Sequence, residues 1–119
     1  MTWLASLDFT WLERGTCSHS REVAGYRPTR MQRELVKVRQ RTCSFPGCRR
    51  PARVCDDDHT TPYDRGGRTC ECNLAPLCRR HHRAKQAPGW SLTQAEPGVL
   101  VWTAPHGRGY TVTADTYPV

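Results

Sequence analysis

The sequence contains few large apolar side chains. Only two Phe and two Met occur among its 119 residues, and hydrophobic residue types make up 37% of the chain. A chain of this length has room for one domain, because domains commonly run to roughly 100 to 150 residues. The apolar core is therefore predicted to be thin, and we expect a second source of stability besides apolar packing.

Long apolar segments are also absent. No run of about 18 apolar residues occurs, so no membrane-spanning segment is predicted. The first fifteen residues have no basic n-region, which argues against a secretory signal. The seven cysteines are an odd number and cannot all pair within one chain. We therefore expect a cytoplasmic protein, where closely spaced cysteines are more often metal ligands than disulfides.

Positive charge is concentrated in one stretch of the chain. Residues 27–53 contain nine Lys and Arg residues and one acid, a net charge of +8, whereas the whole chain carries +7. A second, shorter basic group consists of Arg79, Arg80, Arg83 and Lys85. Such stripes attract phosphate backbones through counterion release and read no sequence. The alternative is a solvated basic surface without a partner.

Periodicity and turn residues predict a small α+β fold. We expect a basic amphipathic helix from Pro28-Thr29 to about Gln40, short strands at 52–60 and 73–77, and a helix from Arg79 to about Gln86. The first helix has a partial apolar stripe, which consists of Met31, Leu35, Val36 and Val38.

The pattern changes to alternation after residue 89. It predicts a small antiparallel hairpin or a three-stranded meander, with Trp90 and Trp102 in its core. We divide the chain into a lead-in segment (1–26), a central domain (27–88) and a C-terminal β-hairpin extension (89–119).

Two close pairs of metal-ligand residues lie about thirty positions apart. The pairs are Cys43-x4-Cys48, with Pro46-Gly47 forming a tight turn between the thiols, and Cys78-x2-His81. This layout is typical of a closed, tetrahedral structural zinc site. Zinc would compensate for the thin core, since its binding free energy becomes folding free energy. Cys70-x-Cys72 could replace one pair, and the roles of Cys55, Cys70 and Cys72 stay open.

Helix geometry separates the two adjacent histidines. Successive residues of an α-helix point about 100° apart, so His81 and His82 cannot both face one metal ion. Cys78 and His81 share a face at spacing i,i+3, and Cys78 and His82 at spacing i,i+4 nearly do as well. One histidine is expected to bind the zinc, and the other is then available for a different function. We interpret His19 and His106, which match no pattern, as surface residues.

Several separated motifs together resemble HNH endonucleases. They are Asp58-His59, Pro62, Gly66-Gly67, Asn73-Leu74, Leu77-Cys78 and His81-His82-Arg83-x-Lys85. The chain is similar in particular to the HNH tails of large repeat-family proteins of actinobacteria, which also carry a Cys-x-x-Pro-Gly-Cys knuckle. The resemblance covers roughly residues 26–112. Those modules usually end a much longer polypeptide, so this chain is expected to be a free-standing minimal nuclease or a truncated remnant.

The resemblance implies a ββα-metal (His-Me finger) fold around a divalent ion. By analogy, His59 would be the general base, Asp58 and His82 would hold the catalytic ion, and Asn73 would pin a loop and orient His59. In some family members the position of Asn73 touches the metal. The ion could be Mg²⁺, Mn²⁺, Ni²⁺ or Zn²⁺, in addition to the structural zinc.

The implied partner is DNA, contacted mainly through its backbone phosphates. The residues expected to contact it are Arg79, Arg80, Arg83, Lys85, Arg49 and Arg50. The implied function is a metal-dependent endonuclease with little sequence preference. The rival hypothesis is a zinc-stabilised nucleic-acid-binding module without catalysis.

Overall fold

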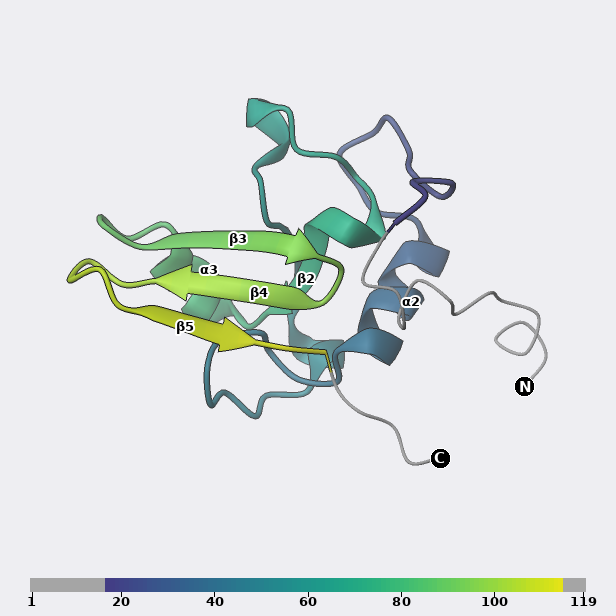
Figure 1. Cartoon of the computed structure of the whole chain (residues 1–119). Helices are drawn as coiled ribbons and strands as arrows, with labels where there is room; N and C mark the ends of the chain where they lie inside the picture. The colour runs from purple at the N-terminus through teal and green to yellow at the C-terminus, as the bar shows by residue number, and fades with distance from the viewer. Residues whose placement is uncertain (1–16, 115–119) are drawn as a thin grey trace.

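The computed structural model describes residues 17–114 of the 119-residue chain. This part contains two α-helices, three short 3-10 helices at 52–54, 63–65 and 71–73, and two antiparallel sheets; Figure 1 shows their arrangement. The helices and strands follow the order α2 (Arg30–Arg39), β1 (Asp56–His59), β2 (Leu74–Leu77), α3 (Arg79–Lys85), β3 (Ser91–Glu96), β4 (Val99–Thr103) and β5 (Gly109–Val112). The predicted α+β class is therefore confirmed. None of the helices described is long and apolar enough to cross a membrane.

Helix α2 begins where the sequence predicts, directly after Thr29. The Thr29 hydroxyl accepts a hydrogen bond from the backbone N–H of Gln32 at 3.1 Å, and the Gln32 side chain accepts one from the N–H of Thr29 at 2.9 Å. This reciprocal pair is a capping box, which satisfies backbone donors that would otherwise lack partners.

The buried face of α2 differs from the predicted apolar stripe. Leu35 and Val36 are fully buried, but Met31 is 43% exposed. Gln32 and Arg39 take the other buried positions. Both donate hydrogen bonds to backbone carbonyls of a neighbouring loop, which satisfies their polar groups inside the fold. The helix is therefore fixed by polar side chains as well as apolar ones.

Strands β1 and β2 form an antiparallel pair in which Asp58 lies opposite Ala75 and His59 opposite Leu74. The loop between the strands folds back on itself at Gly67. A Cβ atom added at this glycine would lie 1.8 Å from the carbonyl oxygen of Thr61, so the close approach requires a residue without a side chain. Helix α3 follows β2 directly and packs against both strands.

Strands β3, β4 and β5 form a three-stranded antiparallel sheet in that order. The meander is thus confirmed, and the simple hairpin extension is wrong because a third strand pairs along β4. Trp102 on β4 is fully buried, and its indole N–H donates to the carbonyl oxygen of Ser44 at 2.9 Å. It packs with Leu77 of β2, while Trp90 lies partly buried at the margin of the same cluster. In Figure 1, β2 and α3 lie behind this sheet and α2 lies at one end of it.

Candidate active site and metal-binding clusters

Three thiols and one imidazole meet at the start of α3. Cys43 and Cys48 flank a tight turn, and Cys78 and His81 lie at the helix N-terminus. We call these four residues the knuckle cluster. Their ligand atoms all lie within 4.8 Å of one another, and Nδ1 of His81 is 3.2 Å from Sγ of Cys78. Zn–S bonds of about 2.3 Å in a tetrahedral site place the ligand atoms about 3.8 Å apart. The knuckle cluster could therefore hold a metal ion.

The knuckle cluster belongs to the hydrophobic core. Cys43 and Cys78 pack with Trp102, and the ring of Phe45 stacks on His81 with centroids 4.0 Å apart. Burial raises the pKa of Cys43 to about 12, so its thiolate needs a neighbouring cation at neutral pH. Burial, with the positive charges of nearby arginines, lowers the pKa of His81 and favours the neutral, metal-binding imidazole.

Cys55 lies beside the knuckle cluster but is not one of its four ligands. Its thiol donates to the carbonyl oxygen of Pro51 at 3.3 Å. Burial raises the pKa of Cys55 to about 11, which keeps it a neutral thiol near pH 7.

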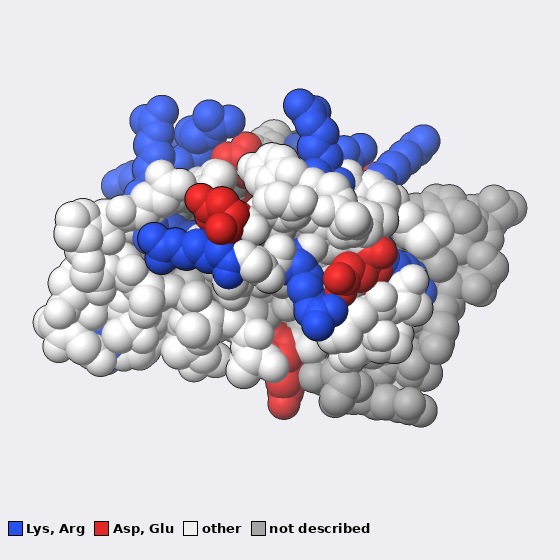
Figure 2. All heavy atoms as spheres, turned by 90° about the horizontal axis from the view of Figure 1, so that it is seen from above, with Lys and Arg blue, Asp and Glu red and all other residues white. Residues whose placement is uncertain are grey.

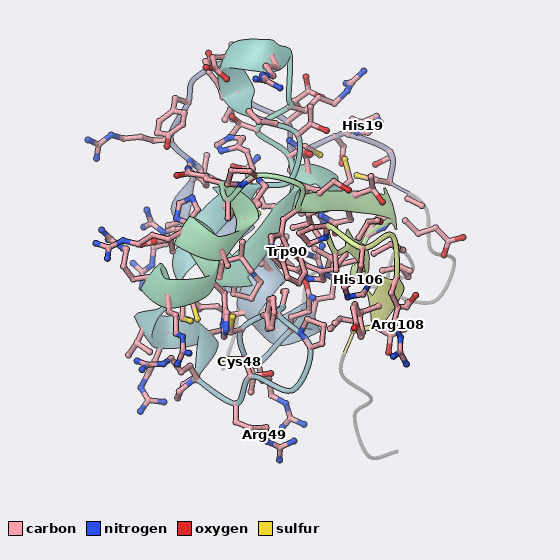
Figure 3. The ribbon with its side chains drawn as sticks, turned by 90° about the vertical axis from the view of Figure 1, so that its left-hand side faces the viewer. His19, Cys48, Arg49, Trp90, His106 and Arg108 are labelled. Carbon is pink, nitrogen blue, oxygen red and sulfur yellow. The ribbon has the colours of Figure 1, made fainter. Side chains whose placement is uncertain are left out.

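A second group of ligand residues lies elsewhere in the fold. Cys17, His19, Cys70 and Cys72, which we call the strap cluster, also have ligand atoms within 4.8 Å of one another and could hold a metal ion. Figure 3 labels His19 and Cys48, which mark the two clusters at well-separated places. The alternative that Cys70-x-Cys72 replaces a pair of the knuckle cluster is therefore wrong. His19 is exposed, as predicted, but the sequence analysis missed that its ring faces thiols.

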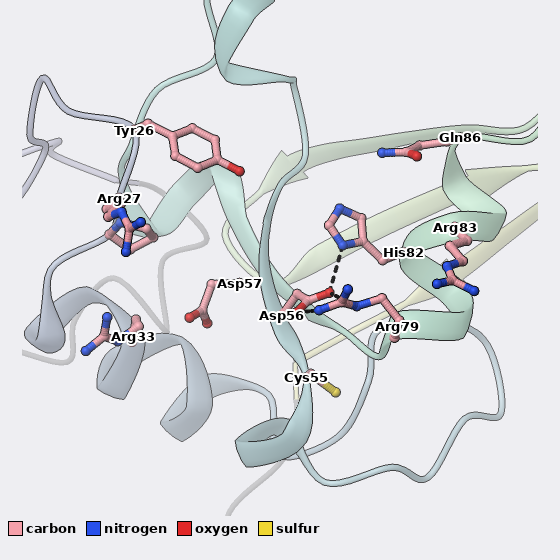
Figure 4. Close-up of a pocket in the computed structure, with 11 residues that line it drawn as sticks. Tyr26, Arg27, Arg33, Cys55, Asp56, Asp57, Arg79, His82, Arg83 and Gln86 are labelled. Carbon is pink, nitrogen blue, oxygen red and sulfur yellow. Dashed lines mark hydrogen bonds and ion pairs between the residues drawn. The ribbon is translucent and has the colours of Figure 1, made fainter.

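The acidic side chains of β1 that face α3 hold both nitrogens of His82. Oδ2 of Asp56 lies 2.9 Å from Nδ1, and Oδ1 of Asp58 lies 3.1 Å from Nε2. The hydrogen bond from His82 holds the pKa of Asp56 below its usual value. Figure 4 shows His82 reaching from α3 toward Asp56, while Asp57 points to the other side of the strand, toward α2. Strand alternation explains this division, because successive side chains point to opposite faces.

Lys85 lies within the same site. Its ammonium group donates to Oδ2 of Asp58 at 2.7 Å and to the backbone carbonyl of His59 at 2.6 Å. The side chain is 12% exposed. The ammonium group of Lys85 is thus directed at Asp58 and at the end of β1.

His59 lies at the end of β1 and is 6% exposed. The ring of Tyr26 stacks on it at a centroid distance of 5.2 Å and an angle of 18°, and Tyr63 meets it edge-on. Its Nε2 lies 3.0 Å from the hydroxyl of Thr69, which itself donates to the carbonyl of Gly25 at 2.6 Å. Burial lowers the pKa of His59, partly offset by the charge of Asp58 next to it. The imidazole is therefore neutral near pH 7.

Asn73 fixes the loop between the two strands. Its amide group donates to the carbonyl oxygens of Thr61 and Arg68 at 3.0 and 2.9 Å, and its Oδ1 accepts the N–H of Thr61 at 2.8 Å. These three bonds tie the two ends of the loop together beyond His59. Among the described residues, the hydrogen bonds of the Asn73 side chain go to the backbone of this loop.

Two adjoining hollows of about 610 and 680 Å³ expose the site to solvent. Both are lined by His82, and the second is also lined by Asp58, His59 and Lys85. The cationic residues along the first hollow are Arg27, Arg33, Arg79 and Arg83. Figure 2 shows Lys and Arg side chains projecting along one edge of the face in view, with few acidic ones among them.

The remaining arginines that the sequence analysis singled out lie outside both hollows. Arg80 is exposed on α3, and Arg49 and Arg50 are exposed beside the knuckle cluster. Figure 3 shows Arg49 extending away from the body of the protein.

Three residues that shape the site were not predicted from the sequence: Asp56, Tyr26 and Thr69. The alternation of β1 was a usable signal for Asp56, since residues 56 and 58 share a face of the strand. Tyr26 and Thr69 reach His59 from segments about 33 and 10 residues away in the sequence, and no local pattern indicates such contacts.

Comparisons with known proteins find relatives without an assigned activity. The chain is 46% identical over 92 residues to "Uncharacterized protein Rv3776" of Mycobacterium tuberculosis, a match that covers 76% of this chain and 18% of that protein. It is 45% identical over 87 residues to "Uncharacterized protein Rv2100" of the same species, covering 72% of this chain and 16% of the relative. It therefore spans less than a fifth of the length of these curated relatives. No family model matches the chain, and no solved structure matches it significantly.

Proposed function

We propose that this chain is a metal-dependent HNH endonuclease that hydrolyses DNA phosphodiester bonds with little sequence preference. The observation that carries the proposal is that Asp58, His59 and His82 line a single hollow open to solvent. The succession of β1, β2 and α3, with α3 packed against both strands and with β1 and α3 lining that hollow, supports a ββα-metal fold.

The hydrogen bonds around His59 favour a role as general base. The carbonyl of Gly25 can only accept, so the Thr69 hydroxyl donates its proton there and must accept from Nε2–H of His59. This assigns the tautomer of a neutral His59 and leaves the Nδ1 lone pair available to take a proton from water. The stacked ring of Tyr26 holds the plane of the imidazole.

Asp58 and His82 are the residues that would hold the catalytic ion. Nε2 of His82 and Oδ1 of Asp58 lie 3.1 Å apart, close enough to bind one cation together, while Nδ1–H of His82 would donate to Asp56. The donor set matches a carboxylate–histidine–metal arrangement. When bound, Mg²⁺, Mn²⁺, Ni²⁺ or Zn²⁺ would stabilise the negative charge that develops on the phosphate. Lys85 neutralises the other oxygen of Asp58.

The basic lining of the hollows supports DNA as the substrate. Arg27, Arg33, Arg79 and Arg83 line the hollow next to His82, where guanidinium groups can bind backbone phosphates. Contacts of this kind position a duplex without reading its bases, which supports low sequence preference. Zinc in the knuckle cluster would hold α3 against the sheet core.

A plasmid-nicking assay tests the proposal. Wild-type protein should convert supercoiled plasmid to the open-circle form when Mg²⁺ or Mn²⁺ is added, with Ni²⁺ and Zn²⁺ as further trials. His59→Ala should lower the nicking rate by at least ~10²-fold, the usual contribution of a general base, while leaving DNA affinity intact. The matched control is His106→Ala, at an exposed histidine in the turn between β4 and β5.

Two results would contradict the proposal. If the wild-type protein binds DNA but never nicks it with any of the four ions, the binding-module hypothesis replaces it. If His59→Ala nicks as fast as the wild type, then His59 is not the base.

A further inference from the structure

The strap cluster brings together ligand atoms from two distant parts of the chain. Cys17 and His19 belong to the segment before α2, and Cys70 and Cys72 lie at the end of the loop before β2. Sγ of Cys17 is 3.5 Å from Sγ of Cys70. Nδ1 of His19 is 3.4 Å from Sγ of Cys72 and 3.6 Å from Sγ of Cys70.

These distances match ligands around one ion. A tetrahedral zinc site separates its ligand atoms by about 3.8 Å, and a set of three thiolates and one imidazole is a common structural zinc set. His19 has a φ angle of 58°, a left-handed conformation that is uncommon for residues other than glycine. The surroundings therefore hold the backbone in an unfavourable conformation while the ring faces the thiols.

The charge around the strap cluster also fits a bound metal. Three thiolates and one Zn²⁺ ion carry a net charge of −1, and the carboxylate of Glu71, 3.6 Å from Sγ of Cys70, adds a second negative charge. Nearby cations would compensate for both. The guanidinium group of Arg39 is fully buried and donates to the carbonyl oxygen of Glu71, the residue between Cys70 and Cys72, at 2.7 Å. Arg21 forms an ion pair with the Glu71 carboxylate at 3.3 Å.

We propose that Cys17, His19, Cys70 and Cys72 form a second structural metal site that binds Zn²⁺. Each chain thus binds two structural zinc ions, one in each cluster. The two sites have different tasks because they join different parts: the knuckle cluster ties α3 to the core, whereas the strap cluster ties the segment before α2 to the loop before β2.

The strap, which we define as residues 17–26, connects the second site to His59. Its Val23 N–H donates to the carbonyl of Thr69 at 3.0 Å, and its Gly25 carbonyl accepts the Thr69 hydroxyl. Tyr26 at its end stacks on His59. The metal in the strap cluster therefore fixes the segment that orients His59. This consequence for His59 rests on the proposed nuclease function, whereas the metal site itself does not.

Metal counting on the purified 119-residue chain tests the site. Zinc-loaded protein with His82→Ala, which removes the imidazole proposed to hold the catalytic ion, should contain two Zn²⁺ per chain by elemental mass spectrometry. Adding His19→Gln or Cys17→Ser should lower the count to one. The matched control is His106→Gln, which should keep two. Substitution with Co²⁺ gives a second measure, because thiolate-to-metal absorption should fall by about half in His19→Gln.

Alkylation of the zinc-loaded wild type keeps the test independent of how the variants fold. Cys17, Cys70 and Cys72 should resist iodoacetamide until a chelator is added, as read by peptide mass spectrometry. One zinc per chain, rapid alkylation of these three thiols with zinc present, or a Cys17–Cys70 disulfide in their place would each overturn the proposal. So would retention of two zinc ions in both variants.

Metal counting also separates this proposal from the nuclease function. A protein that binds two zinc ions but never nicks DNA retains the second site and loses only the proposed function. A protein that nicks DNA with one zinc per chain retains the function and loses the second site.

Discussion

Asp56 binds Nδ1 of His82 at 2.9 Å, on the side of the ring opposite Asp58. This contact holds the orientation of the imidazole, so Asp56 would act as a positioning residue in the proposed nuclease. Asp56→Asn should preserve the size of the side chain but weaken its hold on the His82 ring. We expect the nicking rate at limiting Mn²⁺ to fall by about 10- to 100-fold, the usual effect of losing a carboxylate partner of a metal-binding histidine.

The matched control for Asp56 is Glu34→Gln, at an acid on α2 that lines neither hollow. It should leave the nicking rate unchanged. Raising the Mn²⁺ concentration should restore part of the rate in Asp56→Asn, because the defect lies in holding the ion. Full activity of Asp56→Asn at low Mn²⁺ would show that Asp58 alone orients His82.

Thr69 should be required for activity although it lies outside the exposed hollow. Thr69→Val keeps the shape but leaves Nε2–H of His59 and the carbonyl of Gly25 without their shared partner. Unsatisfied buried polar groups cost about 1–3 kcal/mol each, so we expect a loss of that order in the free energy of unfolding, measured with urea. The nicking rate should fall further than stability explains, because the tautomer of His59 is no longer fixed.

The control for this substitution is Thr93→Val on the exposed side of β3. It should change neither the urea midpoint nor the nicking rate. A Thr69→Val protein with wild-type kinetics would mean that His59 finds its tautomer without the hydroxyl.

The two glycines at positions 25 and 67 should respond oppositely to the same change. A Cβ at Gly67 would lie 1.8 Å from the Thr61 carbonyl oxygen, whereas a Cβ at Gly25 would meet nothing within 4 Å. Gly67→Ala must push the loop apart and strain the Asn73 hydrogen bonds to it, at a cost of about 1–3 kcal/mol in the free energy of unfolding. Gly25→Ala should change that quantity by less than about 0.5 kcal/mol. Equal urea midpoints for the two variants would contradict the close approach at Gly67.

Removal of metal should unfold the chain. The knuckle cluster contributes Cys43 and Cys78 to the same core as Trp102, and structural zinc sites in small domains provide roughly 10–16 kcal/mol of binding free energy. A strong chelator should therefore abolish the cooperative thermal transition seen by tryptophan fluorescence. Zn²⁺ should restore it and Mg²⁺ should not. A chelated protein that melts at the same temperature would show that apolar packing suffices.

Local signals in the sequence predicted much of the fold. The helix start at Thr29 follows from its cap, and the two short strands and α3 lie within the predicted ranges, although residues 52–54 form a 3-10 turn before β1. The sequence left open whether the C-terminal region forms a hairpin or a three-stranded meander, because alternation alone does not show which strands pair.

Contacts between segments far apart in the chain could not be predicted from local sequence patterns. Arg39 belongs to the basic stretch 27–53, in which nothing marks one cation as buried, yet backbone carbonyls satisfy its guanidinium group inside the fold. His19 was expected to be a surface residue although Cys17 lies two positions before it, because its other two thiol neighbours, Cys70 and Cys72, lie about fifty positions away. Helix geometry predicted that the two histidines of α3 face different groups, but it did not decide which one faces the thiols. The structure directs His81 to the thiols and His82 to the acids of β1.

The ammonium group of Lys85 bridges the carboxylate of Asp58 and the main chain of His59. One cation on the last turn of α3 thereby connects the end of the helix to the end of β1. A tilt of either element would break both hydrogen bonds of the Lys85 ammonium group. His82, one turn earlier, keeps its aim at Asp58 before any ligand arrives. The site is thus preorganised, and little rearrangement of its side chains should accompany the binding of a charged ligand.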